Sequence, residues 1–155
     1  MIKKKITSFF IILSFFIYSC GFTPQYAGLK NLEFDLIIDN LSGDRDFNNE
    51  IKSQMKKYDR GRDEVEKLRV SYNSKYEKIT LSKNTKGEAT KYNLKVNVIF
   101  NVNSENYFKK IVFKDEFRID KIDDTIEENN YIKIVKRNFA RRAIEKLIFS
   151  IRQDK

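Results

Sequence analysis

Few side chains of this 155-residue chain could carry covalent chemistry. The sequence has one cysteine, Cys20, and no histidine or tryptophan, which excludes most metal sites and histidine-based acid–base catalysis. Lysine and arginine number 31 against 22 acidic residues, for a formal net charge of +9. The chemistry available is therefore that of one thiol, of ammonium groups that bind anions, and of carboxylates. Four of the carboxylates lie close together in the sequence, at Asp123, Asp124, Glu127 and Glu128.

Those four carboxylates do not form a pattern typical of an enzyme. Catalytic pairs lie in a concave site that separates their pKa values, whereas these lead into a predicted helix, where negative charge stabilises the N-terminus. The sequence also contains no glycine-rich phosphate loop, no Gly-x-Ser-x-Gly motif and no metal-ligand spacing. We therefore expect a protein that is not an enzyme and that needs neither a cofactor nor a metal.

Cys20 follows a segment that resembles a bacterial lipoprotein signal peptide. Residues 1–19 contain three lysines near their start and then an apolar stretch from Ile6 to about Tyr18, which is short for a helix that must cross a bilayer. Ser19 and Cys20 end a lipobox-like Ile-Tyr-Ser-Cys sequence, in which the small serine lets a peptidase reach the bond and the thiol accepts a diacylglyceryl group. We expect cleavage before Cys20 and lipidation. The alternatives are an uncleaved anchor and conventional secretion.

The rest of the chain has the length and charge of one basic domain. Removal of residues 1–19 with their three lysines leaves 136 residues and lowers the net charge from +9 to +6. With Cys20 acylated no disulfide can form, so stability must come from packing. An exported domain meets little nucleic acid, and we expect none as a partner. The abundant anions beyond the inner membrane are phosphates of phospholipids and lipopolysaccharide. The alternative role of the lysines is solubility alone.

Hydrophobic periodicity predicts the element order β-α-β-β-β-α after a tether at residues 20–31. Alternation predicts strands at residues 32–39, 68–81, 92–102 and 111–119, and helical spacing predicts helices over residues 47–58 and from about 129 to 151. We expect residues 32–155 to form a single α+β domain. It is a two-layer sandwich with two helices on one face of a mostly antiparallel four-stranded sheet. The pattern does not identify the partner of the first strand.

The segments between these elements are polar. Residues 40–44 are typical of a turn, and Asp44 or Asp46 can cap the helix that follows. Residues 59–67 are almost all charged and are interpreted as a solvated loop, and residues 121–130 are interpreted as an acidic connection.

Two further expectations concern packing. Apolar residues of the strand at 68–81 change phase, which a bulge near Glu77–Lys78 would explain. Four aromatic side chains are expected in the core between the sheet and the helices: Phe100, Phe113, Phe117 and Phe139.

A lysine-rich connection joins the two longest strands. Lys83, Lys86 and Lys91 surround Asn84 and Gly87. Lysine binds phosphate as a compact point charge, and a hairpin tip can project such charges beyond the domain; the alternative is a solvated tip. The last helix is also basic, but its apolar stripe has the width that packing on a sheet requires, so its charges are interpreted as a solvated face.

The start of the mature chain, the hairpin and the last helix together resemble one known family. The residues that carry the resemblance at the mature start are Cys20, Gly21, Phe22, Pro24 and Tyr26. Those in the hairpin are Asn84, Gly87, Ala89, Tyr92 and Leu94, and the final helix contains IVKRNFARRAIEKL. This chain resembles the alphaproteobacterial-type branch of the LPS-assembly lipoprotein LptE family, which has the same β-α-β-β-β-α order.

The resemblance implies a place and partners. It implies a lipoprotein anchored in the outer membrane through Cys20, with its soluble domain facing the periplasm and the lumen of an LptD-type β-barrel. Such a lipoprotein is a plug and an assembly factor for the barrel, and the pair delivers lipopolysaccharide to the outer leaflet.

The resemblance also implies that basic residues bind lipopolysaccharide, and Lys83 and Lys86 lie at the hairpin position. The family's other basic position falls here in the acidic stretch around Glu127, so the hairpin must do more of the binding or another residue compensates. The alternative function is that of an accessory lipoprotein of another outer-membrane machine, with no lipid ligand.

Overall fold

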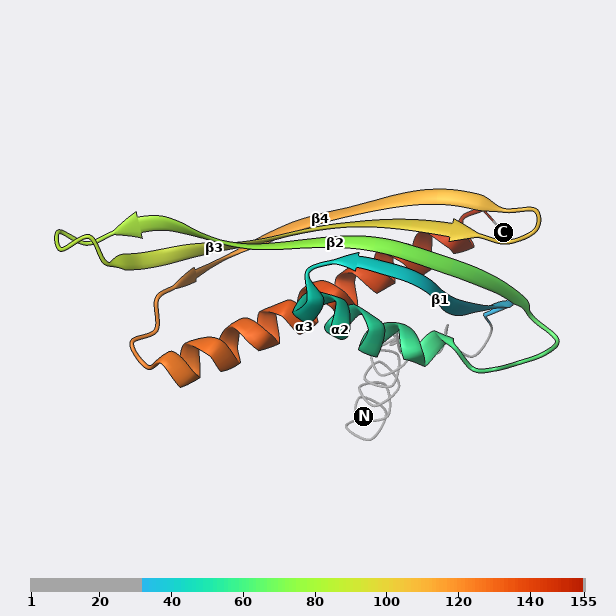
Figure 1. Ribbon diagram of the computed structural model, residues 1–155, viewed down its shortest axis with the longest axis horizontal. Coiled ribbons are helices and arrows are strands. Elements are labelled where there is room, and N and C mark those ends of the chain that lie inside the picture. The colour runs from blue at the N-terminus through green and yellow to red at the C-terminus, as the bar shows by residue number, and fades with distance from the viewer. Residues whose placement is uncertain (1–31, 155) are drawn as a thin grey trace, which may run out of the picture. The chain divides into compact units, whose positions relative to one another are not determined.

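The computed structural model describes residues 32–154, and those from Glu33 on form one compact unit (Figure 1). Its elements are β1 (Phe34–Gly43), α2 (Arg45–Met55), the short 3-10 helix η2 (Lys56–Tyr58), β2 (Glu66–Lys83), β3 (Ala89–Asn103), β4 (Phe108–Asp120) and α3 (Thr125–Arg152). The predicted α+β fold and the order β-α-β-β-β-α are confirmed. Cys20 and the tether lie outside the described residues.

The four strands form one mixed sheet in the order β1-β2-β3-β4. β2, β3 and β4 pair antiparallel through the two short connections that the sequence predicts as hairpins. β1 pairs with β2 in parallel, with Leu36 opposite Leu68. β2 is thus the partner of the first strand, which the sequence pattern does not identify. α2 and the loop after it carry the chain back to the start of the sheet, so that β2 runs beside β1 in the same direction.

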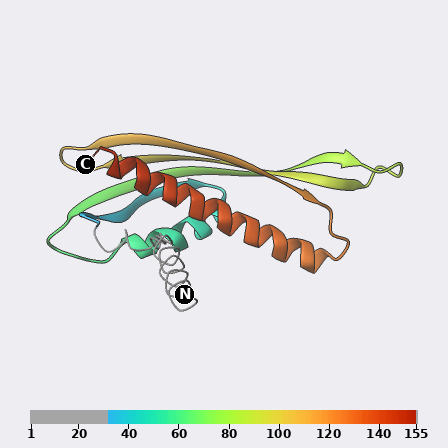
Figure 2. The same cartoon turned by 180° about the vertical axis from the view of Figure 1, so that it is seen from behind.

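Both helices cover one face of the sheet, which Figure 2 shows from the side of α3. β3 contributes alternating buried side chains from Leu94 to Val102, as predicted, and the helices bury Phe47, Ile51 and Phe139 against the sheet. The buried apolar side chains of the core are at most 6% exposed, and they come from every strand and both helices. Because the core is built within this unit, we expect residues 32–155 to fold without the segment before them.

β1 continues through residues 40–43, which the sequence wrongly predicts as part of a turn at residues 40–44. Ser42 and Gly43 pair with Asn73 and Ser74 of β2 after a register shift. Gly43 has a φ of +98°, and a Cβ there would lie 1.8 Å from the backbone oxygen of Ser74. The polar composition that suggested a turn instead belongs to the exposed end of a strand, which a single glycine brings close to its neighbour.

Aspartates cap both helices. Asp44, not Asp46, caps α2, because its Oδ1 accepts from the backbone N of Phe47 at 2.8 Å. Asp124 caps α3, because its Oδ1 accepts hydrogen bonds from the backbone N–H groups of Ile126 and Glu127. α3 therefore begins at Thr125, earlier than predicted. Residues 125–130 of the predicted acidic connection belong to the helix, and the macrodipole stabilises the negative charges of Glu127 and Glu128 in its first turn.

The predicted bulge at Glu77–Lys78 is wrong. Pairing of β2 with β3 is continuous through these residues, and the register shifts only beyond Thr80. Ile79 consequently lies on the sheet face away from the helices and is 40% exposed, while Leu81, which is 47% exposed, lies within the register shift itself. The phase change therefore reflects an apolar side chain on the outer face of β2 and a register shift two residues later, and Lys78 points to the helix side.

Two of the four aromatic residues expected in the core are not buried there. Phe100 and Phe139 are fully buried, but Phe113 is only partly buried and Phe117 is 41% exposed. Asp115, the acidic residue on the same face of β4, forms a 2.8 Å ion pair with Arg142 of α3. This part of β4 therefore contacts α3 through a salt bridge, and the side chain of Phe117 beside it is open to solvent instead of lying in a closed apolar layer.

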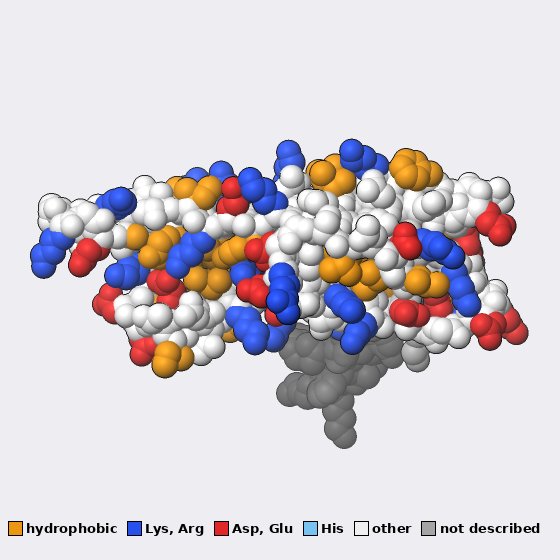
Figure 3. Space-filling model, viewed as in Figure 1, with side chains coloured by type: hydrophobic (Ala, Val, Ile, Leu, Met, Phe, Trp, Pro, Cys, Tyr) orange, Lys and Arg blue, Asp and Glu red, His pale blue; other side chains and the backbone are white. Residues whose placement is uncertain are grey.

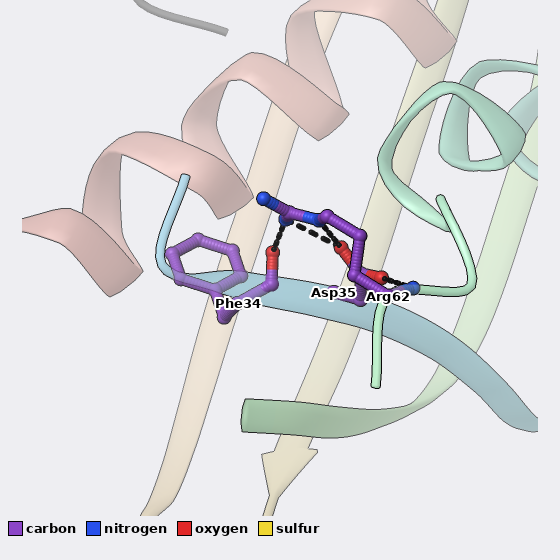
Figure 4. Close-up of polar contacts among 3 residues, drawn as sticks. All are labelled: Phe34, Asp35 and Arg62. Atoms are coloured by element: carbon purple, nitrogen blue, oxygen red, sulfur yellow. Dashed lines mark hydrogen bonds and ion pairs between the residues drawn. The ribbon is translucent and has the colours of Figure 1, made fainter. Parts of the chain in front are cut away.

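A buried ion pair holds the loop between η2 and β2 against β1 (Figure 4). Asp35 is 1% exposed and accepts three hydrogen bonds from Arg62: from its backbone N at 2.9 Å, Nε at 3.1 Å and Nη2 at 2.6 Å. Nη2 also donates to the backbone oxygen of Phe34 at 3.1 Å. The predicted charged loop at 59–67 is solvated except where this arginine turns inward, and its last two residues begin β2.

Candidate functional site

Asn84 and Gly87 shape the tip of the β2–β3 hairpin. The Asn84 Oδ1 accepts from the backbone N of Lys86 at 3.0 Å and of Glu88 at 2.9 Å. Gly87 has a φ of +84°, and its backbone N–H donates to the backbone oxygen of Asn84 at 3.0 Å. An asparagine that bonds its own turn and a glycine at positive φ are typical of a short hairpin loop. The sequence pattern of the hairpin therefore has a local structural cause.

Lys83 and Lys86, the predicted lipopolysaccharide-binding residues, lie at this tip. Lys83 ends β2 opposite Ala89, Lys86 lies within the turn, and both are exposed. In the described part of the chain neither ammonium group forms an ion pair. The tip extends beyond both helices, and Figure 3 shows basic side chains at that end of the molecule. Two unpaired ammonium groups on a projecting turn can contact phosphate groups.

The stem of the hairpin is fastened to α3. Lys78 Nζ lies 2.6 Å from Glu128 Oε1 and 3.8 Å from the ring centroid of Tyr92. Glu128 also accepts from the backbone N of Ile122 at 3.2 Å. The hydrogen bond from Lys78 is the main reason that the pKa of Glu128 lies below its usual range. No local pattern predicts this pair, because 50 residues separate its members.

The acidic stretch at the start of α3 therefore includes a carboxylate that is neutralised from β2. About two turns further along α3, Lys136 Nζ lies 4.2 Å from the ring centroid of Tyr76. Burial raises the pKa of Tyr76 to about 12. Figure 3 shows hydrophobic side chains gathered between the hairpin and the N-terminal half of α3, with basic side chains across them. Lys78 is thus a basic group beside the position that is acidic in the sequence, and Lys136 is a second basic group about two turns further along α3.

Lys136 also lines a concavity of about 490 Å³ between α2 and α3. Lys133 lies on the same side, and Asp46 and Glu50 of α2 lie opposite. Glu50 is in turn 3.7 Å from Arg137. Because the two helices present opposite charges, this concavity does not have the uniform charge of a strong anion site.

The centre of the sheet face away from the helices is polar, whereas the exposed apolar side chains of Ile79 and Val112 lie to either side of that centre. Lys75, Asn97 and Lys114 lie in one row across β2, β3 and β4. In the next row Lys95 lies between Glu77 and Glu116. The two rows line a shallow concavity of about 600 Å³, and their charges alternate. Such a face can form hydrogen bonds with another polar surface.

Two structural features bear on other classes of function. Among residues 32–154, no three His, Cys, Asp or Glu side chains are grouped as metal ligands. None of the helices in that range is both long enough and apolar enough to span a membrane.

No family model and no curated protein matches the chain. The solved structures that are similar to it include two lipoproteins. Rare lipoprotein B from Shewanella oneidensis is 18% identical, with a TM-score of 0.47, over 75% of this chain and 96% of its own. A protein described as a lipoprotein from Caulobacter crescentus is 10% identical, with a TM-score of 0.42, over 83% of this chain and 96% of its own. At these values neither likeness bears on the activity of this chain.

Proposed function

We propose that this protein is an outer-membrane lipoprotein that partners an LptD-type β-barrel, as plug and assembly factor, and binds lipopolysaccharide through its hairpin tip. It acts by binding and not as an enzyme, and acylated Cys20 anchors it. The observation that carries the proposal is the hairpin. The Asn84 and Gly87 of the pattern that resembles the family form a turn that presents Lys83 and Lys86, both unpaired among the described residues, beyond the helices.

The polar sheet face supports the barrel partnership. The lumen of an outer-membrane barrel is polar, so a plug needs polar surfaces to lie against it. The rows around Asn97 and Lys95 have that character.

Lipid binding is tested by reversing the charges at the tip. Charge-assisted contacts at an exposed site contribute at most about 1.5–3 kcal/mol and weaken as salt rises. Lys83→Glu combined with Lys86→Glu should therefore weaken binding of lipopolysaccharide by residues 32–155 at least tenfold at fixed ionic strength. The matched control is Lys110→Glu combined with Lys146→Glu, which makes the same change in net charge at exposed sites away from the tip. Equal binding by both double variants would show that the tip is only a solvated turn.

The partnership and the anchor are tested in native membranes. Affinity purification should recover an LptD-type barrel protein together with this chain. Recovery of a different outer-membrane complex would favour the alternative, an accessory lipoprotein without a lipid ligand. Cys20→Ala should block processing and leave the precursor in the inner membrane, because the thiol that accepts the diacylglyceryl group is lost. In the parent the acyl chains hold the protein in the outer membrane, since each buried CH₂ contributes about 0.8 kcal/mol. Mass spectrometry that finds an unmodified mature Cys20 would exclude the lipid anchor.

A further inference from the structure

A small groove lies between β4 and α3, and Figure 2 shows the course of these two elements. Its volume is about 280 Å³. Phe117 of β4 and Tyr131, Ile134 and Val135 of α3 form its apolar part, and Arg141 and Arg142 lie at one end. The groove is separate from the hairpin tip, since neither tip lysine lines it.

The apolar part of the groove is open to solvent. Phe117 is 41%, Tyr131 is 39% and Ile134 is 53% exposed. Ile111 and Ile119 point to the same face of β4 and are only 4% and 5% exposed. The apolar layer between β4 and α3 is therefore closed at both ends of the strand and open at Phe117. Covering these side chains with apolar atoms would be favourable in proportion to the area removed from water.

The two arginines at the end of the groove keep donors available. Arg142 Nη2 contacts Asp115 Oδ2 at 2.8 Å, and Arg141 Nη1 contacts Glu145 Oε1 at 3.3 Å. The two side chains are 44% and 49% exposed. A guanidinium has five N–H donors, so one contact to a carboxylate leaves others free for an anion. α3 as a whole carries seven basic and three acidic residues, which favours an anionic ligand.

We propose that this groove binds a single anionic amphiphile, with an alkyl chain over Phe117, Tyr131 and Ile134 and its phosphate or carboxylate at Arg141 and Arg142. The volume suits one chain better than a folded partner. A second copy of this protein docked through the same face would place these arginines near their own symmetry mates, which like-charge repulsion disfavours. The proposal goes beyond the proposed function and does not rest on it.

The probe is dodecyl phosphate, titrated below its micelle concentration into residues 32–155 and followed by calorimetry and amide NMR shifts. Each buried methylene strengthens binding about fourfold, which is about 0.8 kcal/mol at 1.36 kcal/mol per decade. Octyl phosphate should therefore bind at least tenfold more weakly, and inorganic phosphate should not saturate in the same range. Dodecyl maltoside, with the same chain and a neutral head, should bind more weakly than dodecyl phosphate. Equal affinity of all three alkyl ligands would overturn the proposal.

The variants separate the groove from general hydrophobic binding. Ile134→Asn should weaken dodecyl phosphate binding at least tenfold, whereas Ile126→Asn, at a residue 74% exposed and outside the groove, should leave binding unchanged. Arg141→Gln should weaken binding of dodecyl phosphate but not of dodecyl maltoside. Thermal unfolding checks that each variant is folded, and Tyr131→Ser replaces Ile134→Asn if that variant is not.

The outcomes distinguish this site from the hairpin and from self-association. The Lys83→Glu, Lys86→Glu double variant should bind dodecyl phosphate like the parent, so a loss there would move the site to the tip and refute the groove. A concentration-dependent doubling of mass that Ile134→Asn abolishes would identify the occupant as a second copy and also refute the proposal. Equal losses in Ile134→Asn and Ile126→Asn would show binding without a site.

Discussion

Replacing Arg62 with methionine tests how much the buried pair with Asp35 stabilises the fold. The substitution removes the Nε and Nη2 donors, at 3.1 and 2.6 Å, from a carboxylate that is 1% exposed. The backbone N–H of residue 62 remains as a donor at 2.9 Å. The methionine keeps an apolar stem in place of the arginine stem, so the change is mainly in charge and hydrogen bonding.

The expected loss follows from the burial of the remaining charge. Breaking a buried ion pair by removing one partner typically costs about 3–5 kcal/mol. Because one backbone hydrogen bond to Asp35 survives and Arg62 is itself 31% exposed, we expect the lower end, about 3 kcal/mol at pH 7. For a domain of this size that is a decrease of about 10 °C in Tm.

The loss should depend on pH in a definite direction. Burial by itself raises the pKa of Asp35, but hydrogen bonds from the side chain and backbone of Arg62 outweigh it, and the pKa lies below its usual range. The parent therefore has this stabilisation at every pH above the ordinary carboxyl pKa of about 3.9 and loses it as the pH falls toward the lower folded value. In Arg62→Met, burial dominates and raises the pKa of Asp35, so protonation becomes favourable in the folded state. The difference between the two proteins should shrink from pH 7 to pH 4.

Urea titration followed by far-UV circular dichroism at pH 7, 5.5 and 4 measures this difference. The control is Lys67→Met, which removes an exposed ion pair with Asp63 of 3.5 Å and should change stability by no more than about 0.5 kcal/mol. A loss below about 1 kcal/mol for Arg62→Met, or a loss that is the same at all three pH values, would refute this account of the pair.

Five further substitutions test the packing at three places in the fold and are measured by denaturant titration or hydrogen exchange. Gly43→Ala should lower the free energy of unfolding by about 3 kcal/mol or more, because the new Cβ would lie 1.8 Å from the backbone oxygen of Ser74. Gly87→Ala should cost only about 1 kcal/mol, because the site has open space and only the positive φ is unfavourable. Equal losses would contradict the close approach of β1 to β2. Phe139→Ala should cost about 3–5 kcal/mol and Phe117→Ala less than about 1 kcal/mol, and the reverse order would mean that α3 packs differently. Lys78→Met should speed amide exchange in the hairpin stem while leaving the rest of the sheet protected, and unchanged exchange would show that the ion pair to α3 does not hold the stem.

Much of the fold is predictable from local pattern. The alternation in β3, the apolar stripe of α2 and the aspartate before it depend on neighbours within a few residues, so their elements follow from sequence alone. The place of Lys83 and Lys86 on a hairpin tip is predictable for the same reason, since Asn84 and Gly87 encode the turn locally.

The rest depends on which segments meet in space. The parallel pairing of β1 with β2 and the pairs Asp35–Arg62 and Lys78–Glu128 join residues 27 to 50 positions apart, and no local period encodes them. Phe117 has the spacing of a core residue, yet it is exposed because burial on one face of a strand also requires a helix to lie over that point. Period and capping are properties of a segment, whereas burial, ion pairing and the groove beside Phe117 arise from the way α3 is placed on the sheet.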